Sequence, residues 1–264
     1  MNIAITKMHG AGNDFIVVDD RFLLFPISDS RFVEKICTRR TGIGSDGVLL
    51  IQPSTTADLK MRFINPDGYE VQMCGNGARC FARRAFELGA APSPMVIETA
   101  AGLIRADIQE DQVQLTLTDP MNWRMGLDIG LTRLVDFVNT GVPHVVVRVD
   151  DLETLDLQTS GRSIRCHDLF SPDGTNVNFI KVEIDGSLSI RTYERGVEAE
   201  TLACGTGATA AAVIAARQGW VELPVAVHCA GGYDLIINSG SGGTILSGGA
   251  VTVFEGEIEY GNRV

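Results

Sequence analysis

The stretch Cys74-Gly75-Asn76-Gly77-Ala78 returns in altered form as Cys204-Gly205-Thr206-Gly207-Ala208, which is 204 − 74 = 130 residues further along the chain. Each copy follows a short run typical of a β-strand and precedes a stretch typical of a helix. We predict these two helices over residues 77–88 and 207–218. Because the spacing is about half the chain length, the repetition predicts a duplicated unit, with one Cys-Gly-x-Gly turn at a helix N-terminus in each half.

The remainder of the chain favours strands over helices. Short apolar runs alternate with polar residues and are separated by turn residues, as in half-buried strands. Beyond the two helices named above, we predict a helix only over residues 29–38. We therefore expect an α+β fold of two lobes, 1–118 carrying Cys74 and 119–264 carrying Cys204, and we leave open that the last strand packs back on the first lobe.

Composition limits the classes of partner. The chain has 264 residues, a net charge of −11 and 45% hydrophobic residues, enough for a full core. A strongly acidic chain is a poor match for nucleic acid or an anionic membrane surface. The N-terminus lacks the apolar stretch of a signal peptide, and the longest apolar run, near 208–216, is too short to span a bilayer. These features predict a soluble cytoplasmic protein, and the acidic charge does not argue against a small zwitterionic substrate.

Cysteine and histidine usage argues against a disulfide scaffold or a metal site. Six cysteines in a chain of this length form no CxxC pair, and the four histidines are scattered. Four of the cysteines fit small buried apolar residues, and these are Cys37, Cys80, Cys166 and Cys229. That interpretation leaves the glycines after Cys74 and Cys204 unexplained.

A cysteine at a helix N-terminus is chemically distinctive. The unpaired backbone N–H groups and the helix dipole there favour a thiolate. The flanking glycines let the backbone approach an anion such as a substrate carboxylate. Two such thiols can invert a carbon centre, because one removes a proton from one face while the other delivers a proton to the opposite face. Cys74 and Cys204 are thus the candidate acid–base pair, and no cofactor is required.

The chain resembles the diaminopimelate epimerase family over essentially its whole length. The matching motifs occur in order, and they are MHGAGNDF, RRTGIGSDG, FINPDG, MCGNGARC, GVPHVVV, GTNVNF, YERGVEAETLACGTG and VFEGEI. The resemblance implies a homodimer of pseudo-symmetric lobes, each with mainly antiparallel strands wrapped around a central helix, and an active site in the cleft between them. It implies interconversion of LL- and meso-2,6-diaminopimelate, in lysine and peptidoglycan-precursor synthesis, without pyridoxal phosphate or metal.

The resemblance also assigns roles by position. Cys74 and Cys204 would shuttle the proton, with His144 and Glu194 supporting them. Arg195 would bind the distal carboxylate, since a guanidinium suits bidentate binding. The remaining candidate binding residues are Asn13, Asn65, Gly75, Asn76, Asn176, Glu194, Gly205 and Thr206.

The sequence departs from the family at two positions. Gly47 stands where a glutamine is common, and Val142 where an asparagine is common. A racemase of another amino acid, such as histidine, therefore remains an alternative, whereas proline racemases typically carry CGHG at the first cysteine. A non-catalytic binding protein would not need two thiols, and a thiol-disulfide oxidoreductase would be expected to carry CxxC.

Overall fold

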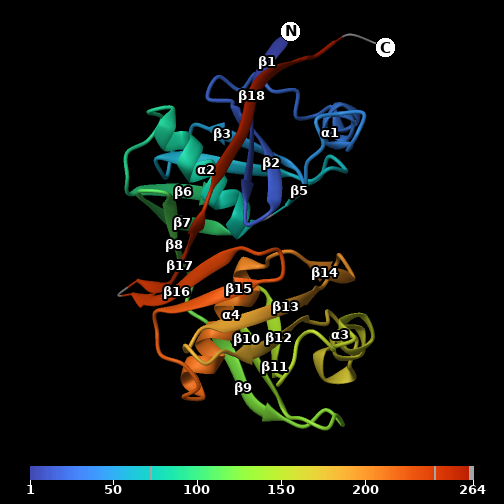
Figure 1. The fold of residues 1–264 in the computed structure, drawn as a ribbon. Coiled ribbons are helices and arrows are strands. Elements are labelled where there is room, and N and C mark those ends of the chain that lie inside the picture. The colour runs from blue at the N-terminus through green and yellow to red at the C-terminus, as the bar shows by residue number, and fades with distance from the viewer. Residues whose placement is uncertain (72, 241, 262–264) are drawn as a thin grey trace. The chain divides into compact units, whose positions relative to one another are not determined.

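A computed structural model describes residues 1–71, 73–240 and 242–261. Contacts divide the chain into two compact units (Figure 1). The first comprises Met1–Leu115 together with Gly248–Val264, and the second comprises Thr116–Ser247.

The first unit is a mixed sheet with two helices. Strand β18 pairs with β1 in antiparallel fashion, and β1 pairs with β2. The order then continues through β2–β3 (parallel), β3–β4 (antiparallel), β4–β6 (parallel) and β6–β7 (antiparallel). The elements are β1 (Asn2–Gly10), β2 (Asn13–Asp19), α1 (Ser30–Cys37), β3 (Val48–Gln52), β4 (Leu59–Ile64), β5 (Glu70–Val71), α2 (Gly75–Glu87), β6 (Met95–Thr99), β7 (Gly102–Gln109), β8 (Gln112–Leu117) and β18 (Val251–Glu259).

The second unit repeats this plan. Strand β9 pairs with β10 and β10 with β11, both antiparallel, followed by β11–β12 (parallel), β12–β13 (antiparallel), β13–β15 (parallel) and β15–β16 (antiparallel). The elements are β9 (Met121–Leu127), β10 (Val135–Asn139), β11 (Pro143–Arg148), α3 (Leu157–Arg165), a 3-10 helix (Asp168–Phe170), β12 (Asn176–Val182), β13 (Leu188–Glu194), β14 (Ala199–Thr201), α4 (Gly205–Arg217), β15 (Val225–Cys229), β16 (Asp234–Gly240) and β17 (Gly243–Gly249).

The register of β2, β3 and β4 agrees residue by residue with that of β11, β12 and β13. Leu49 on β3 lies opposite Phe63 on β4, and Asn178 on β12 lies opposite Thr192 on β13. Both members of the second pair are 129 positions further along the chain (178 − 49 and 192 − 63). The prediction of an α+β fold with two pseudo-symmetric lobes is confirmed.

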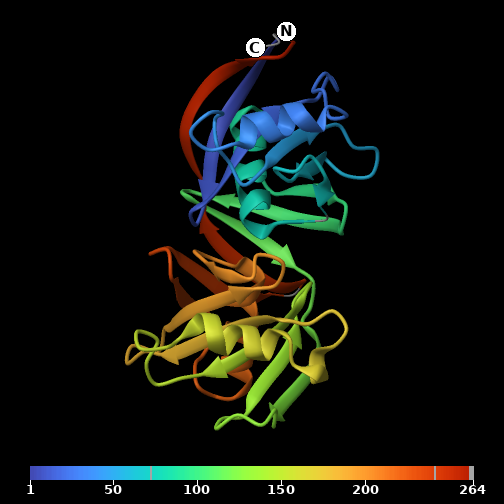
Figure 2. The ribbon, with the colours of Figure 1, turned by 90° about the vertical axis from the view of Figure 1, so that its right-hand side faces the viewer.

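One helix in each unit lies among the strands, as Figure 1 shows for α2 and α4. Helix α2 packs against β1, β2, β3 and β7, and α4 packs against β10 to β13, β15 and β16. The opposite face of each sheet packs on α1 or α3, which Figure 2 shows on the outside of its unit. Strand β3 is buried on both faces for this reason and is entirely apolar except for Gln52 at its end.

Several element boundaries differ from the sequence-based expectation. Both central helices begin at the residue after the cysteine, two residues earlier than predicted, because the Cys-Gly-x-Gly turn is itself helical. Helix α3 was not predicted. The chain from Gly248 onward groups with the first unit because β18 pairs along the length of β1, an arrangement that the sequence left open.

Candidate active site

Cys74 and Cys204 occupy the same position in their units. Each is the N-cap residue of its central helix, with extended backbone angles of φ −139° and ψ 122° for Cys74, and φ −119° and ψ 110° for Cys204. In each case the carbonyl oxygen accepts the first helical hydrogen bond, from Ala78 or Ala208, at 2.8 Å. Both thiols therefore lie beside the helix N–H groups that have no partner within the helix.

Cys74 faces the side-chain oxygen of Asn13, which begins β2. Its Sγ lies 3.4 Å from Asn13 Oδ1, and Asn76 Nδ2 donates to the same oxygen at 3.4 Å. Asn13 Nδ2 donates to Asp46 Oδ2 at 2.6 Å. Because a carboxylate only accepts, this bond fixes which end of the Asn13 amide faces the thiol. Cys74 therefore faces a hydrogen-bond acceptor.

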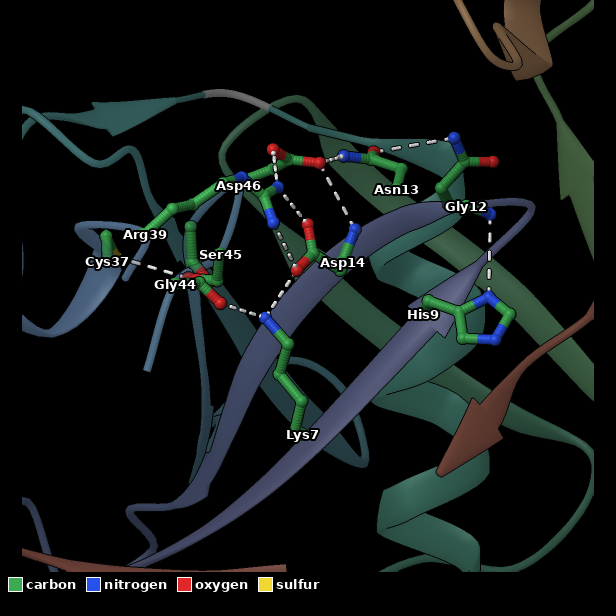
Figure 3. A network of polar contacts seen from close by, with 12 residues as sticks. Lys7, His9, Gly12, Asn13, Asp14, Cys37, Arg39, Gly44, Ser45 and Asp46 are labelled. Carbon is green, nitrogen blue, oxygen red and sulfur yellow. Dashed lines mark hydrogen bonds and ion pairs between the residues drawn. The ribbon is translucent and has the colours of Figure 1, made fainter. Parts of the chain in front are cut away.

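Asp46 belongs to a charged network behind Asn13 (Figure 3). Arg39 Nη2 contacts Asp46 Oδ1 at 2.9 Å and Asp14 Oδ1 at 2.6 Å, and Lys7 Nζ contacts Asp14 Oδ2 at 2.5 Å. Burial acts to raise the pKa of Asp14, but hydrogen bonds from Arg39 and Lys7 outweigh it and hold that pKa below its usual value. The network keeps the loop after α1 against the start of β2.

Cys204 has a different neighbour, the hydroxyl of Thr206. The distance from Cys204 Sγ to Thr206 Oγ1 is 3.5 Å. The same hydroxyl lies 2.9 Å from His144 Nε2, and the Thr206 carbonyl accepts a hydrogen bond from Thr140 at 2.8 Å. His144 and Thr206 are thus brought to the second cysteine, as candidates for its support.

His144 is fully buried and makes polar contacts through both ring nitrogens. Its Nδ1 lies 3.1 Å from Asn178 Nδ2. Desolvation by burial, with a smaller contribution from the positive charge of Arg195, lowers the pKa of His144 to about 3. The imidazole is therefore neutral at physiological pH, with one ring nitrogen a donor and the other an acceptor.

Glu194, Arg195 and Asn176 form a second group at the end of β13. Burial raises the pKa of Glu194, and a hydrogen bond from Thr201 Oγ1 to Glu194 Oε2 at 2.8 Å partly offsets it. Asn176 Oδ1 accepts from the Arg195 backbone N–H at 2.9 Å, and Asn176 Nδ2 donates to the Pro143 carbonyl at 3.1 Å. Asn176 thereby ties β11 to the main chain that carries the Arg195 guanidinium.

Asn65 and the two positions that differ from the usual family residue, Gly47 and Val142, lie in turns or at strand ends. Asn65 closes the turn after β4, where its N–H donates to the Tyr69 carbonyl at 2.8 Å. A Cβ at Gly47 would lie 2.4 Å from a ring carbon of Phe63, so the structure leaves no room for a side chain there. Val142 lies in the β10–β11 turn and is half-buried.

The structure adds three residues that the sequence did not single out. Asp46 accepts a hydrogen bond from Asn13, Asn178 contacts His144 Nδ1, and Thr192 donates to Asn178. Asp46 stands within a matching motif, and the alternation Asn176-Val177-Asn178 places both asparagines on one face of β12. Among the other thiols, burial raises the pKa of Cys80 to about 12, so that residue stays protonated.

No helix within 1–71, 73–240 and 242–261 is long and apolar enough to cross a membrane. Over the same residues, histidine, cysteine and carboxylate side chains form no cluster of three or more that could hold a metal ion.

The fold is shared with solved structures of low sequence identity. The crystal structure of a phenazine biosynthesis protein of the PhzF family from Bacillus anthracis matches with a TM-score of 0.73 at 19% identity, covering 98% of this chain and 100% of that chain. The class defined by fold and site is thus a two-unit α+β protein with a cysteine at the start of each central helix.

Sequence comparison defines the family. The pattern of the diaminopimelate epimerase family matches residues 5–123 and 137–253. A diaminopimelate epimerase of Aquifex aeolicus is 42% identical over 96% of this chain and 96% of its own length. One from Chlorobaculum tepidum is 43% identical over 95% of this chain and 99% of its own length. The chain belongs to the diaminopimelate epimerase family.

Proposed function

We propose that this protein epimerises LL-2,6-diaminopimelate to meso-2,6-diaminopimelate, with Cys74 and Cys204 as its acid–base pair. The observation that carries the proposal is the placement of the two cysteines at equivalent helix N-caps in a chain that matches the family over nearly its full length. Binding alone requires neither thiol, whereas inversion of a carbon centre requires an acid and a base on opposite faces.

In the LL-to-meso direction the Cys204 thiolate removes the α-proton and the Cys74 thiol supplies one to the other face. The reverse reaction exchanges their roles. The acceptor character of Asn13 Oδ1 supports this assignment, because that oxygen stabilises the protonated form of Cys74. The N–H groups at both helix starts would stabilise charge that develops at the substrate carboxylate.

The substrate contacts follow from the same assignment. The turns Gly75-Asn76 and Gly205-Thr206 hold the carboxylate at the reacting carbon through backbone N–H groups. Arg195 binds the distal carboxylate, with Asn176 fixing its main chain. Glu194 also contacts the substrate, and His144 and Glu194 support the thiols. Asn13 and Asn65 complete the set.

The decisive test is an isotope experiment in heavy water. The purified protein is incubated with LL-diaminopimelate without added cofactor, and both isomers and α-deuterium are followed. Meso product carrying α-deuterium is expected. Absence of both product and exchange would exclude this substrate, and a parallel panel with histidine and proline would then identify a racemase of another amino acid.

The meso product serves lysine and peptidoglycan-precursor synthesis, so we place the protein in the cytoplasm. We also propose that it works as a homodimer, which sedimentation at concentrations near and below the micromolar range would test.

A further inference from the structure

Three polar side chains lie buried beneath α4 where the first unit has three apolar ones. His144 and Asn178 are fully buried, and Thr192 is nearly so. With the shift of 129 positions between the strand registers, their counterparts are Phe15, Leu49 and Phe63. These three side chains fill the space beneath α2 with apolar atoms, and the rings of Phe15 and Phe63 pack edge to face with centroids 5.6 Å apart.

This difference shows that the fold itself does not require polar groups at these positions. Burying an amide, an imidazole and a hydroxyl costs free energy unless every group is hydrogen-bonded. Gly207 accommodates the amide, because a Cβ there would lie 2.4 Å from Asn178 Oδ1. Its counterpart Gly77 faces only Leu49 and Phe15 side chains, at 3.3 Å or more. The second unit is thus specifically shaped around Asn178.

The hydrogen bonds of Asn178 determine its orientation. Its Nδ2 donates to the Val145 carbonyl at 3.0 Å, and a carbonyl can only accept. Its Oδ1 accepts from Thr192 Oγ1 at 3.0 Å. The amide nitrogen therefore also faces His144 Nδ1, as the donor of that 3.1 Å contact.

From this arrangement we infer that Asn178 is a positioning residue, which holds His144 in the Nε2–H tautomer so that the Thr206 hydroxyl is directed at Cys204. An Nδ1 that accepts from Asn178 leaves the ring proton on Nε2. Nε2 then donates to Thr206 Oγ1, and the hydroxyl proton of Thr206 points to Cys204 Sγ. The inference rests on the proposed function only in giving the Cys204 thiolate a catalytic role.

The tautomer can be measured without substrate. Long-range ¹H–¹⁵N spectra of ¹⁵N-labelled protein should show His144 with an unprotonated Nδ1 and a protonated Nε2, and only four histidines contribute. Asn178→Asp replaces the donor by an acceptor of the same shape, so His144 should change to the Nδ1–H form. A wild-type Nδ1–H tautomer, or an unchanged tautomer in a folded Asn178→Asp variant, would overturn the inference.

Activity provides the second readout. Asn178→Asp should lower kcat by about 10- to 100-fold, because the Thr206 hydroxyl would no longer be directed at the Cys204 thiolate. This is the usual effect of losing a hydrogen bond to a charged group. In a Thr206→Val background, where no hydroxyl remains, the same substitution should have little further effect. An equal loss in both backgrounds would mean that Asn178 acts only on the fold. Leu49→Met at the counterpart position is the matched control and should leave activity unchanged.

The two readouts separate the inference from the proposed function. If wild-type protein shows no α-proton exchange with any amino acid tested, the proposed function fails, while the tautomer measurement still decides the role of Asn178. If exchange occurs and the tautomer is wrong, only the role of Asn178 fails.

Discussion

The backbone has a similar conformation at the start of α2 and at the start of α4, but the side chains around the two cysteines differ. Cys74 faces an amide oxygen, Asn13 Oδ1, held by the carboxylate of Asp46. Cys204 faces a hydroxyl, that of Thr206, held by the neutral imidazole of His144. An amide oxygen can only accept, whereas a hydroxyl can donate. The duplication therefore supplies two similar turns, and the neighbouring side chains make them chemically different.

This difference matters for a reaction that needs one acid and one base at a time. Two thiols in identical surroundings would share the proton without preference. An acceptor beside Cys74 stabilises a thiol, and a donor beside Cys204 stabilises a thiolate. In the proposed two-base reaction, this contrast would favour proton transfer in one direction.

The largest effect is expected from removing either thiol. Cys74→Ser and Cys204→Ser should each lower epimerisation by about 10³-fold or more, because a hydroxyl is a far weaker acid than a thiol at neutral pH. Isomer formation in heavy water measures the loss. Cys166 is exposed and not buried as the sequence suggested, so Cys166→Ser is the control and should behave as wild type. Full activity in either single variant would refute the two-base scheme.

Asparagine at position 49, the counterpart of Asn178, tests whether the first unit can bury a polar side chain beneath its central helix. Leu49→Asn should lower the free energy of unfolding by about 3 kcal/mol, because it leaves an amide and a small void among the rings of Phe15 and Phe63. Urea unfolding measures the change, with Leu49→Met as the control of similar volume. A cost below about 1 kcal/mol would show that this space tolerates polar groups.

The duplication and the two helix starts could be predicted from the sequence, but the side chains that surround the two cysteines could not. The Cys-Gly-x-Gly repeat is local, so its position at a helix N-terminus could be predicted from spacing and glycine content. The contact of Asp46 with Asn13 joins residues 33 positions apart, and that of Asn178 with His144 joins residues 34 apart. Such contacts depend on strand pairing and register, which short alternating runs do not specify.

The orientation of Asn13 gives the next prediction. Asn13→Asp would place a second carboxylate 2.6 Å from Asp46, and the repulsion should displace the group that faces Cys74. We expect a loss of about 10- to 100-fold in kcat/KM. The exchange variant Asn13→Asp with Asp46→Asn restores a donor and an acceptor at this contact, so it should recover part of the activity. An exchange variant no better than the single one would contradict the orienting role of Asp46.

The smallest effect concerns Glu194, whose counterpart in the first unit is Asn65 at a shift of 129 positions. Burial raises the pKa of Glu194 and the Thr201 hydroxyl lowers it, so Thr201→Val should raise that pKa further. The folded protein then holds the proton to a higher pH than the unfolded chain, and the free energy of unfolding falls as pH rises through this interval. If ionised Glu194 supports the thiols, the activity of Thr201→Val at acidic pH should fall by about five-fold or less, with little change above neutrality.

Rate–pH profiles and urea unfolding at matched pH measure both effects. Thr201→Ser keeps the hydroxyl and should follow the wild type, whereas a profile shifted equally in both variants would show that the hydrogen bond to Glu194 is not responsible.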